Sequence, residues 1–181
     1  MKKLTVLIFI VFSTTMHAQP HFGLKAGGNL AALRGNAGSQ PAPRIGFHAG
    51  GFAAVPLAGG LHVVPELQFS LQGNKQGPYL LNLGYINMPL LLQYLTKGGF
   101  YVEVGPQAGL LVRARLKGPV NQDAAAKFSS LDIGGCLGLG YKEKHGFGIG
   151  ARYILGFSNI AAANYAPAKN GVVQLSVLCG F

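Results

Sequence analysis

The chain has 181 residues, 49% of them hydrophobic and only 11% charged, and it contains 28 glycines. This composition is too apolar for a disordered chain, the length indicates a single domain, and the lack of an internal apolar run of about 18 residues excludes a helical membrane span. The net charge of +10 comes from scattered basic residues, which argues against a nucleic-acid partner and favours attraction to anionic lipid or polysaccharide.

The chain begins with the pattern of a secretory signal peptide, Met1–Ala18. Two lysines precede the apolar core Leu4–Phe12, and small residues lead to the expected cleavage between Ala18 and Gln19. The alternative is an uncleaved helical anchor, which is disfavoured because the apolar core is far shorter than the roughly 20 residues that a span needs. The sequence therefore predicts export by the general secretory route and a mature domain over residues 19–181.

Eight segments of the mature chain alternate between apolar and polar residues, the period of two that is typical of a strand. In Leu61–Gln72 the odd-numbered residues are all apolar over about 11 positions, which is roughly the length that a tilted strand needs to cross a bilayer. Pro89 and Pro106 lie inside predicted strands and cannot donate to the ladder, so we expect a bulge or a local break at each. The predicted strands are Phe22–Ala32, Arg44–Val55, Leu61–Gln72, Leu83–Leu95, Phe100–Arg113, Phe128–Tyr141, Phe147–Phe157 and Gly171–Phe181.

The connections between these segments alternate in length. The predicted long loops are Leu33–Pro43, Gly73–Asn82, Ala114–Lys127 and Ser158–Asn170, and the predicted short turns are Pro56–Gly60, Thr96–Gly99 and Lys142–Gly146. Outer-membrane barrels have long extracellular loops and short periplasmic turns. The sequence therefore predicts an all-β fold, an eight-stranded antiparallel up-and-down transmembrane β-barrel with both termini in the periplasm.

Every charged residue inside the predicted strands falls on the face opposite the apolar stripe. A lipid-facing Arg or Lys near the bilayer midplane would cost about 2–4 kcal/mol, whereas the interior of an eight-stranded barrel is filled by side chains. We therefore expect an internal salt-bridge network that plugs the lumen, with Glu66 and Glu103 against Lys25 and Arg152 near mid-wall. The alternative is a narrow polar pore or proton path. The full inward set is Lys25, Arg44, Glu66, Glu103, Arg113, Asp132 and Arg152.

Other reactive residues give no functional motif. Cys136 is expected to face the lumen and Cys179 the lipid, which disfavours a disulfide between them. His48 and His62 point inward and are expected to be hydrogen-bonded packing residues. The sequence has no metal-binding spacing, no nucleotide-binding turn and few polar groups at the outer rim, so no catalytic residue, cofactor or metal site is predicted.

Five stretches, in order along the mature chain, carry a family resemblance. They are Phe22–Leu30 (FGLKAGGNL), Pro65–Gly73 (PELQFSLQG), Tyr85–Leu92 (YINMPLLL), Val102–Leu111 (VEVGPQAGLL) and Ala151–Ile160 (ARYILGFSNI). Together they resemble the PorT-like outer-membrane beta-barrel family of Bacteroidetes. The resemblance implies an outer-membrane barrel of a Gram-negative cell without enzymatic activity, and one member of that family is linked to secretion of proteases to the cell surface. Phe181, at the end of the last strand, resembles the signal by which the barrel-assembly machinery recognises its clients.

We therefore expect an integral outer-membrane barrel with a structural, surface-interaction or secretion-accessory role and no catalysis. The expected partners are outer-membrane lipid, the barrel-assembly machinery, and cell-surface or secretion partners that meet the extracellular loops. A soluble, exported, lipocalin-like ligand carrier is the alternative, but its lumen would be apolar and its exterior polar, the reverse of this pattern. A barrel enzyme that acts on lipid or peptide is disfavoured by the bare outer rim.

Overall fold

The computed structural model describes residues 19–35, 42–118, 122–124, 128–161 and 167–181, and the predicted signal peptide lies outside them. These residues form long antiparallel strands and one two-residue strand. In chain order they are β1 (His21–Gly35), β2 (Ala42–Pro56), β3 (Leu61–Gln76), β4 (Tyr79–Leu95), β5 (Phe100–Lys117), β6 (Gln122–Asp123), β7 (Leu131–Lys142), β8 (Phe147–Gly156) and β9 (Ala168–Gly180). None of the described residues belongs to a helix long and apolar enough to cross a membrane.

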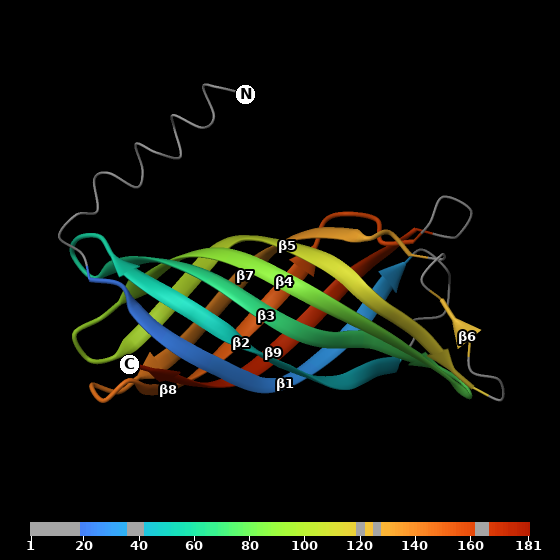
Figure 1. Cartoon of the computed structure of the whole chain (residues 1–181), viewed down its shortest axis with the longest axis horizontal. Helices are drawn as coiled ribbons and strands as arrows, with labels where there is room; N and C mark the ends of the chain where they lie inside the picture. Colours follow the sequence, from blue (N-terminus) through green and yellow to red (C-terminus); the bar gives the residue numbers. More distant parts are fainter. Residues whose placement is uncertain (1–18, 36–41, 119–121, 125–127, 162–166) are drawn as a thin grey trace, which may run out of the picture.

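The eight long strands close into a barrel. Each pairs antiparallel with the next along the chain, and β9 pairs with β1 to complete the ring. The predicted eight-stranded antiparallel up-and-down barrel is therefore confirmed. Closure gives each of the eight long strands a neighbour on both sides, whereas an open sheet would leave two strand edges unpaired. The short β6 pairs only with the far end of β5, beside the wall (Figure 1).

The two ends of the barrel differ. At one end, on the left in Figure 1, lie the start of β1, the C-terminus and the short turns that join β2 to β3, β4 to β5 and β7 to β8. We call this the turn end. At the other end, the loop end, lie the connections β1–β2, β3–β4, β5–β7 and β8–β9.

The predicted loop Gly73–Asn82 is wrong. Backbone pairing between β3 and β4 continues to Gln76 and Tyr79, so the hairpin closes with only Gly77 and Pro78 between the strands. Beyond the membrane a strand can be polar on both faces, and the alternation that predicted the other strands is lost there. For the same reason β5 runs on to Lys117, past its predicted end at Arg113.

The prolines break the pairing locally but do not shift its register. The pairing of β3 with β4 skips the position of Pro89, the pairing of β4 with β5 skips that of Pro106, and the register is the same on either side. In the pairing of β4 with β5 a bulge lies instead where Val112 has no partner, between the pairs Tyr85–Leu111 and Gly84–Arg113, and the pairing of β2 with β3 also shifts register, between Pro43 and His48. An extra residue reverses the alternation of side chains beyond it.

The two faces of the wall otherwise alternate as predicted. On β3, Leu67 is exposed on the outer face while its neighbours Glu66 and Gln68 are buried in the lumen. Large apolar side chains such as Leu24, Leu137 and Val177 are exposed all round the outer face. A transmembrane barrel requires this apolar exterior.

The tight turn between β7 and β8 depends on Gly146, which has a φ of +90°. A Cβ atom there would lie 2.2 Å from the Gly180 carbonyl oxygen, so both strain and a backbone clash oppose any other residue. We expect Gly146→Ala to lower the free energy of unfolding by roughly 2 kcal/mol or more, since the left-handed conformation alone costs about 1–2 kcal/mol. Urea unfolding of the refolded barrel measures this loss.

Gly59→Ala is the matched control for Gly146→Ala. Gly59 also has a positive φ, +62°, but a Cβ atom there would meet nothing within 4 Å. Its substitution is expected to cost only the conformational part, about 1 kcal/mol. Equal losses in the two variants would show that the clash with Gly180 has no effect.

Candidate functional site

Four charged side chains from four strands meet inside the barrel. Arg152 on β8 donates from Nη1 to Glu66 Oε2 at 2.7 Å and from Nη2 to Glu66 Oε1 at 2.8 Å. Its Nε donates to Glu103 Oε1 at 2.8 Å, and Lys25 Nζ lies 3.0 Å from Glu66 Oε1. We call Lys25, Glu66, Glu103 and Arg152 the lumen charge cluster.

The lumen charge cluster is neutral and buried. Two cations face two carboxylates, and Arg152 is only 3% exposed. Gln93 Nε2 donates to the remaining Glu103 oxygen, Oε2, at 3.2 Å. A Cβ atom on Gly138 would lie 2.7 Å from Glu103 Oε1, so the glycine leaves the space that this carboxylate occupies. Buried charges are tolerated only with such partners, because their desolvation costs several kcal/mol per ion.

The other three residues of the expected network lie elsewhere. Arg44 is half-buried and donates from Nη1 to the Gln72 carbonyl oxygen at 2.7 Å. Asp132 is buried in the lumen, where it accepts hydrogen bonds from Ser158 Oγ at 2.9 Å and Asn170 Nδ2 at 3.2 Å, and the described part of the chain gives it no ion pair. The inward placement of Arg113 is wrong, because the bulge at Val112 turns its side chain to the exposed outer face.

A chain of neutral hydrogen bonds fills the lumen between the lumen charge cluster and the loop end. His48 contacts Asn29 Oδ1 through Nδ1 at 2.7 Å and Ser176 Oγ through Nε2 at 2.9 Å. Asn29 donates to Ser70 Oγ, which also accepts from Gln72. The side-chain amide of Asn170 continues this chain and donates to Gln72 and to Asp132. These contacts make His48 a hydrogen-bonded packing residue.

The cysteines lie where the alternation predicts. Cys136 is buried in the lumen and donates to Gln107 Oε1 at 3.5 Å. Cys179 is half-buried on the opposite face, and both thiols are free. Within the described residues no group of three or more His, Cys, Asp or Glu side chains could hold a metal ion.

An apolar cluster closes the lumen at the loop end, and sequence reasoning missed it. Leu83, Tyr85 and Ala114 come from the wall, whereas Ala124 and Ile160 come from the connections after β5 and β8. Beside the lumen charge cluster the remaining cavity has a volume of about 20 Å³, enough for one water molecule. Charged, polar and apolar layers thus succeed one another along the interior.

Six exposed basic side chains surround the loop end on the outer face. They are Arg34, Lys75, Arg113, Arg115, Lys117 and Lys169, and we call them the outer basic collar. Arg34 pairs in register with Lys169, and Lys75 and Lys117 both pair with Leu80. The whole sequence has five acidic residues, of which only Asp123 and the buried Asp132 belong to this end. Sequence reasoning placed several of these residues in loops and so did not group them.

The terminal aromatic residue predicted as an assembly signal lies at the turn end. Phe181 is 75% exposed, and its backbone N–H donates to the Phe22 carbonyl oxygen at 2.8 Å. Recognition of Phe181 by the assembly machinery stays a prediction.

Known proteins match the chain in sequence and in fold. Residues 17–162 match the family described as outer membrane protein beta-barrel domain. No curated protein matches the chain. The crystal structure of Neisserial surface protein A (NspA) is similar, with a TM-score of 0.64 and 16% sequence identity over 88% of this chain and 97% of that chain.

A second solved structure shares the fold. It is Ail, the attachment invasion locus protein of Yersinia pestis, in complex with the heparin analogue sucrose octasulfate. Its TM-score is 0.53 and its sequence identity is 13%, over 90% of this chain and 99% of that chain. At these identities the likeness to both proteins establishes a common barrel fold.

Proposed function

Because the chain belongs to the outer membrane protein beta-barrel domain family, we propose that it is a non-catalytic surface protein that binds an anionic polysaccharide or glycolipid through the outer basic collar. The protein is located in the outer membrane, and its wall is apolar on the face that meets lipid. The filled lumen favours a closed barrel over the narrow pore that the sequence left open, because the cavity beside the lumen charge cluster has a volume of only about 20 Å³.

The outer basic collar is the observation that carries this proposal. Six cations face outward at the level where the apolar wall ends, against few acidic residues at this end of the barrel. Asp123 pairs in register with Arg115, and the described side chains give the other five cations no ion pair with a carboxylate. Basic side chains at a membrane surface attract anionic groups by about 1 kcal/mol each. Ail, which shares the fold, has been solved with the heparin analogue sucrose octasulfate, a sulfated sugar.

Replacing three collar residues tests the proposal. We expect Arg113→Gln/Arg115→Gln/Lys117→Gln to weaken binding of heparin about tenfold to hundredfold at low salt, because each cation contributes up to roughly 1 kcal/mol. The affinity is measured with the folded protein in neutral detergent, and also on lipopolysaccharide vesicles to separate a membrane-borne ligand from a free one. Added salt is expected to weaken wild-type binding steeply.

The matched control removes three lysines at the opposite end of the barrel. Lys97→Gln/Lys144→Gln/Lys142→Gln lowers the net charge by the same amount but leaves the outer basic collar intact. Equal loss of heparin binding in both triple variants would show that net charge, not the collar, determines the affinity, and would contradict the proposal.

The finer assignment to a PorT-like family is also a proposal. It is supported by the place of the resembling stretches in the barrel. Four of the five each contain one member of the lumen charge cluster: Phe22–Leu30, Pro65–Gly73, Val102–Leu111 and Ala151–Ile160. The resemblance therefore covers the residues that meet in the lumen. A secretion-accessory role rests on this resemblance alone.

A further inference from the structure

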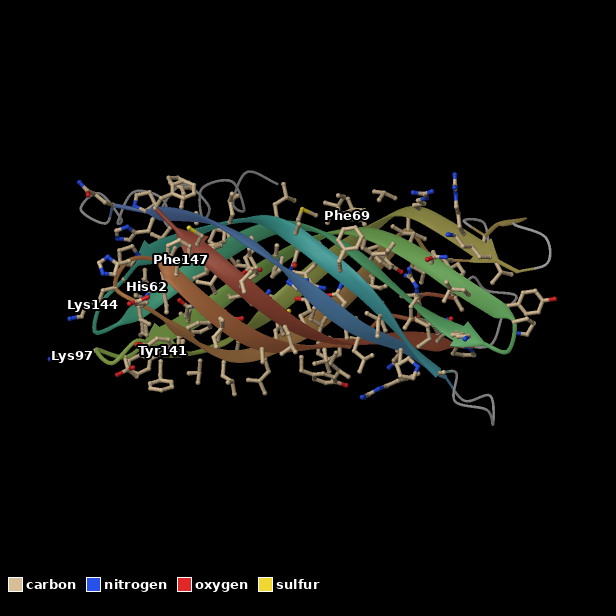
Figure 2. The ribbon with its side chains drawn as sticks, turned by 90° about the horizontal axis from the view of Figure 1, so that it is seen from below. His62, Phe69, Lys97, Tyr141, Lys144 and Phe147 are labelled. Carbon is tan, nitrogen blue, oxygen red and sulfur yellow. The ribbon has the colours of Figure 1, made fainter. Side chains whose placement is uncertain are left out.

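A second basic site lies at the turn end. A cavity of about 720 Å³ opens there between the turns Thr96–Gly99 and Glu143–Gly146 and the neighbouring strand ends. Its lining includes basic and acidic groups: Lys97, Lys142, Lys144, His62, His145, Glu143 and the C-terminal residue Phe181. Figure 2 shows Lys97, Lys144 and His62 gathered at this end. We call this cavity the turn-end vestibule.

Lys142 lies deepest in the turn-end vestibule. It occupies an inward position on β7, is half-buried, and also lines the small cavity beside the lumen charge cluster. Its Nζ lies 5.7 Å from the centre of the Phe52 ring. No carboxylate of the described residues lies within ion-pair distance of that ammonium. A ring face compensates a partly desolvated cation only in part, so the site is suited to an added anion.

Two equivalent turns place the other lysines at the mouth of the vestibule. In Thr96–Gly99 the Thr96 N–H donates to the Phe100 carbonyl oxygen at 2.8 Å. The Thr96 carbonyl oxygen accepts from the Gly99 N–H at 3.0 Å. Glu143–Gly146 repeats the pattern, with 2.7 Å to the Phe147 carbonyl and 3.0 Å within the turn. Lys97 and Lys144 are the second residues of these turns, so both turns present an exposed ammonium at corresponding positions.

We propose that the turn-end vestibule binds a phosphate-bearing ligand, with Lys142 at its base and Lys97 and Lys144 at its mouth. Three ammonium groups against the Glu143 side chain and the terminal carboxylate of Phe181 leave a net positive charge that favours an anion, and a phosphate monoester carries close to two negative charges at neutral pH. Concave, low-dielectric walls strengthen the potential of such a cluster. The volume lies within the range of about 300–1,000 Å³ that is typical of small-molecule sites. Since the short turns of outer-membrane barrels face the periplasm, the ligand comes from that side.

Calorimetric titration with inorganic pyrophosphate tests the proposal on the folded, full-length protein in neutral detergent. We expect saturable binding to the wild type and a loss of affinity of roughly tenfold or more in Lys142→Gln, as for one lost charge-assisted hydrogen bond. Lys97→Gln/Lys144→Gln changes only exposed turn residues and is expected to weaken binding similarly while the protein stays folded. Absence of saturable binding to the wild type, or unchanged affinity in both variants, would overturn the proposal.

A second experiment determines whether the phosphate belongs to a phospholipid headgroup or to a soluble ligand. Nanodiscs of phosphatidylcholine, with or without phosphatidylglycerol, expose both ends of the barrel to pyrophosphate. If phosphatidylglycerol lowers the pyrophosphate affinity of the wild type, and this difference between the nanodiscs is absent in Lys142→Gln, a phospholipid headgroup occupies the vestibule. Equal affinity in both nanodiscs identifies a soluble phosphate ligand.

The collar variant Lys75→Gln/Lys117→Gln/Lys169→Gln is the matched control for the vestibule. It removes three lysines at the loop end and is expected to keep the wild-type pyrophosphate affinity. Heparin binding is measured on the same proteins. Loss of pyrophosphate binding in the collar variant would overturn the proposed phosphate site in the vestibule. Loss of heparin binding in the vestibule variants would overturn only the function proposed for the collar.

Discussion

Arg152→Ala is expected to lower the free energy of unfolding by about 3–5 kcal/mol, the largest effect of any single substitution proposed for this barrel. Arg152 makes four contacts within 2.8 Å to Glu66 and Glu103. Without it, Glu66 keeps only Lys25 as a cationic partner, and Glu103 keeps the Gln93 amide but no cation. The loss is measured by urea unfolding of the refolded barrel, followed by its change in gel mobility.

Three further variants separate the charge effect from other causes. Arg34→Ala removes an exposed arginine that lies 5.5 Å over the Tyr153 ring and is expected to cost about 1 kcal/mol or less. Glu66→Gln removes the partner of both cations and is expected to lower heat stability in detergent, in the same direction as Arg152→Ala. Neutralising all four members together as Lys25→Met/Glu66→Gln/Glu103→Gln/Arg152→Met is expected to recover part of the loss, because no uncompensated charge remains. An unfolding midpoint in Arg152→Ala equal to the wild type would contradict the role of the lumen charge cluster.

Leu137→Arg is expected to cost about 2–4 kcal/mol, because it places a cation on the lipid face near the bilayer midplane. Leu137 is 65% exposed on the outer face at the centre of β7, between the inward Cys136 and Gly138. Unfolding in lipid vesicles measures the effect. Leu57→Arg is the control: Leu57 is also exposed but lies in the turn between β2 and β3, where an arginine reaches water and is expected to cost about 1 kcal/mol or less. Equal costs at both positions would show that position 137 does not face hydrocarbon.

The barrel and its sidedness could be predicted because the membrane imposes a period of two. Each strand that crosses lipid must be apolar at every second residue, and β3 keeps that pattern from Leu61 to Leu71. The meeting of Glu66 and Glu103 with Lys25 and Arg152 followed from the same constraint, since charges inside a narrow lumen must find partners. Sequence reasoning used only the alternation and the length of each segment.

The features that could not be predicted lie where this constraint ends. Above the lipid, β3 and β4 pair through Asn74 and Lys75 with no apolar stripe to reveal them. One unpaired residue, Val112, reverses the faces of β5, and no residue type marks such a bulge. The assumption that every strand charge points inward therefore failed at Arg113, and the outer basic collar was not anticipated.

Tertiary packing of connections produced the remaining surprises. Ile160 is fully buried in the apolar cluster at the loop end although it lies outside every strand. The turn-end vestibule depends on two turns and several strand ends that are far apart in sequence and meet only when the barrel closes. The periodicity within one segment does not predict such contacts between segments that are distant in sequence.

Accessibility along β7 tests most directly which face of the wall meets lipid. Residues 131–141 are replaced one at a time by cysteine, in a background where both native cysteines are serine, and spin-labelled in vesicles. We predict strong collisional relaxation by oxygen at odd positions and weak relaxation at even ones, with the water-soluble nickel reagent ineffective at odd positions away from the strand ends. Oxygen accessibility without this alternation, or access of the nickel reagent to positions 133, 137 and 139, would contradict the claim that the apolar outer face meets lipid and the charged side chains lie in the lumen.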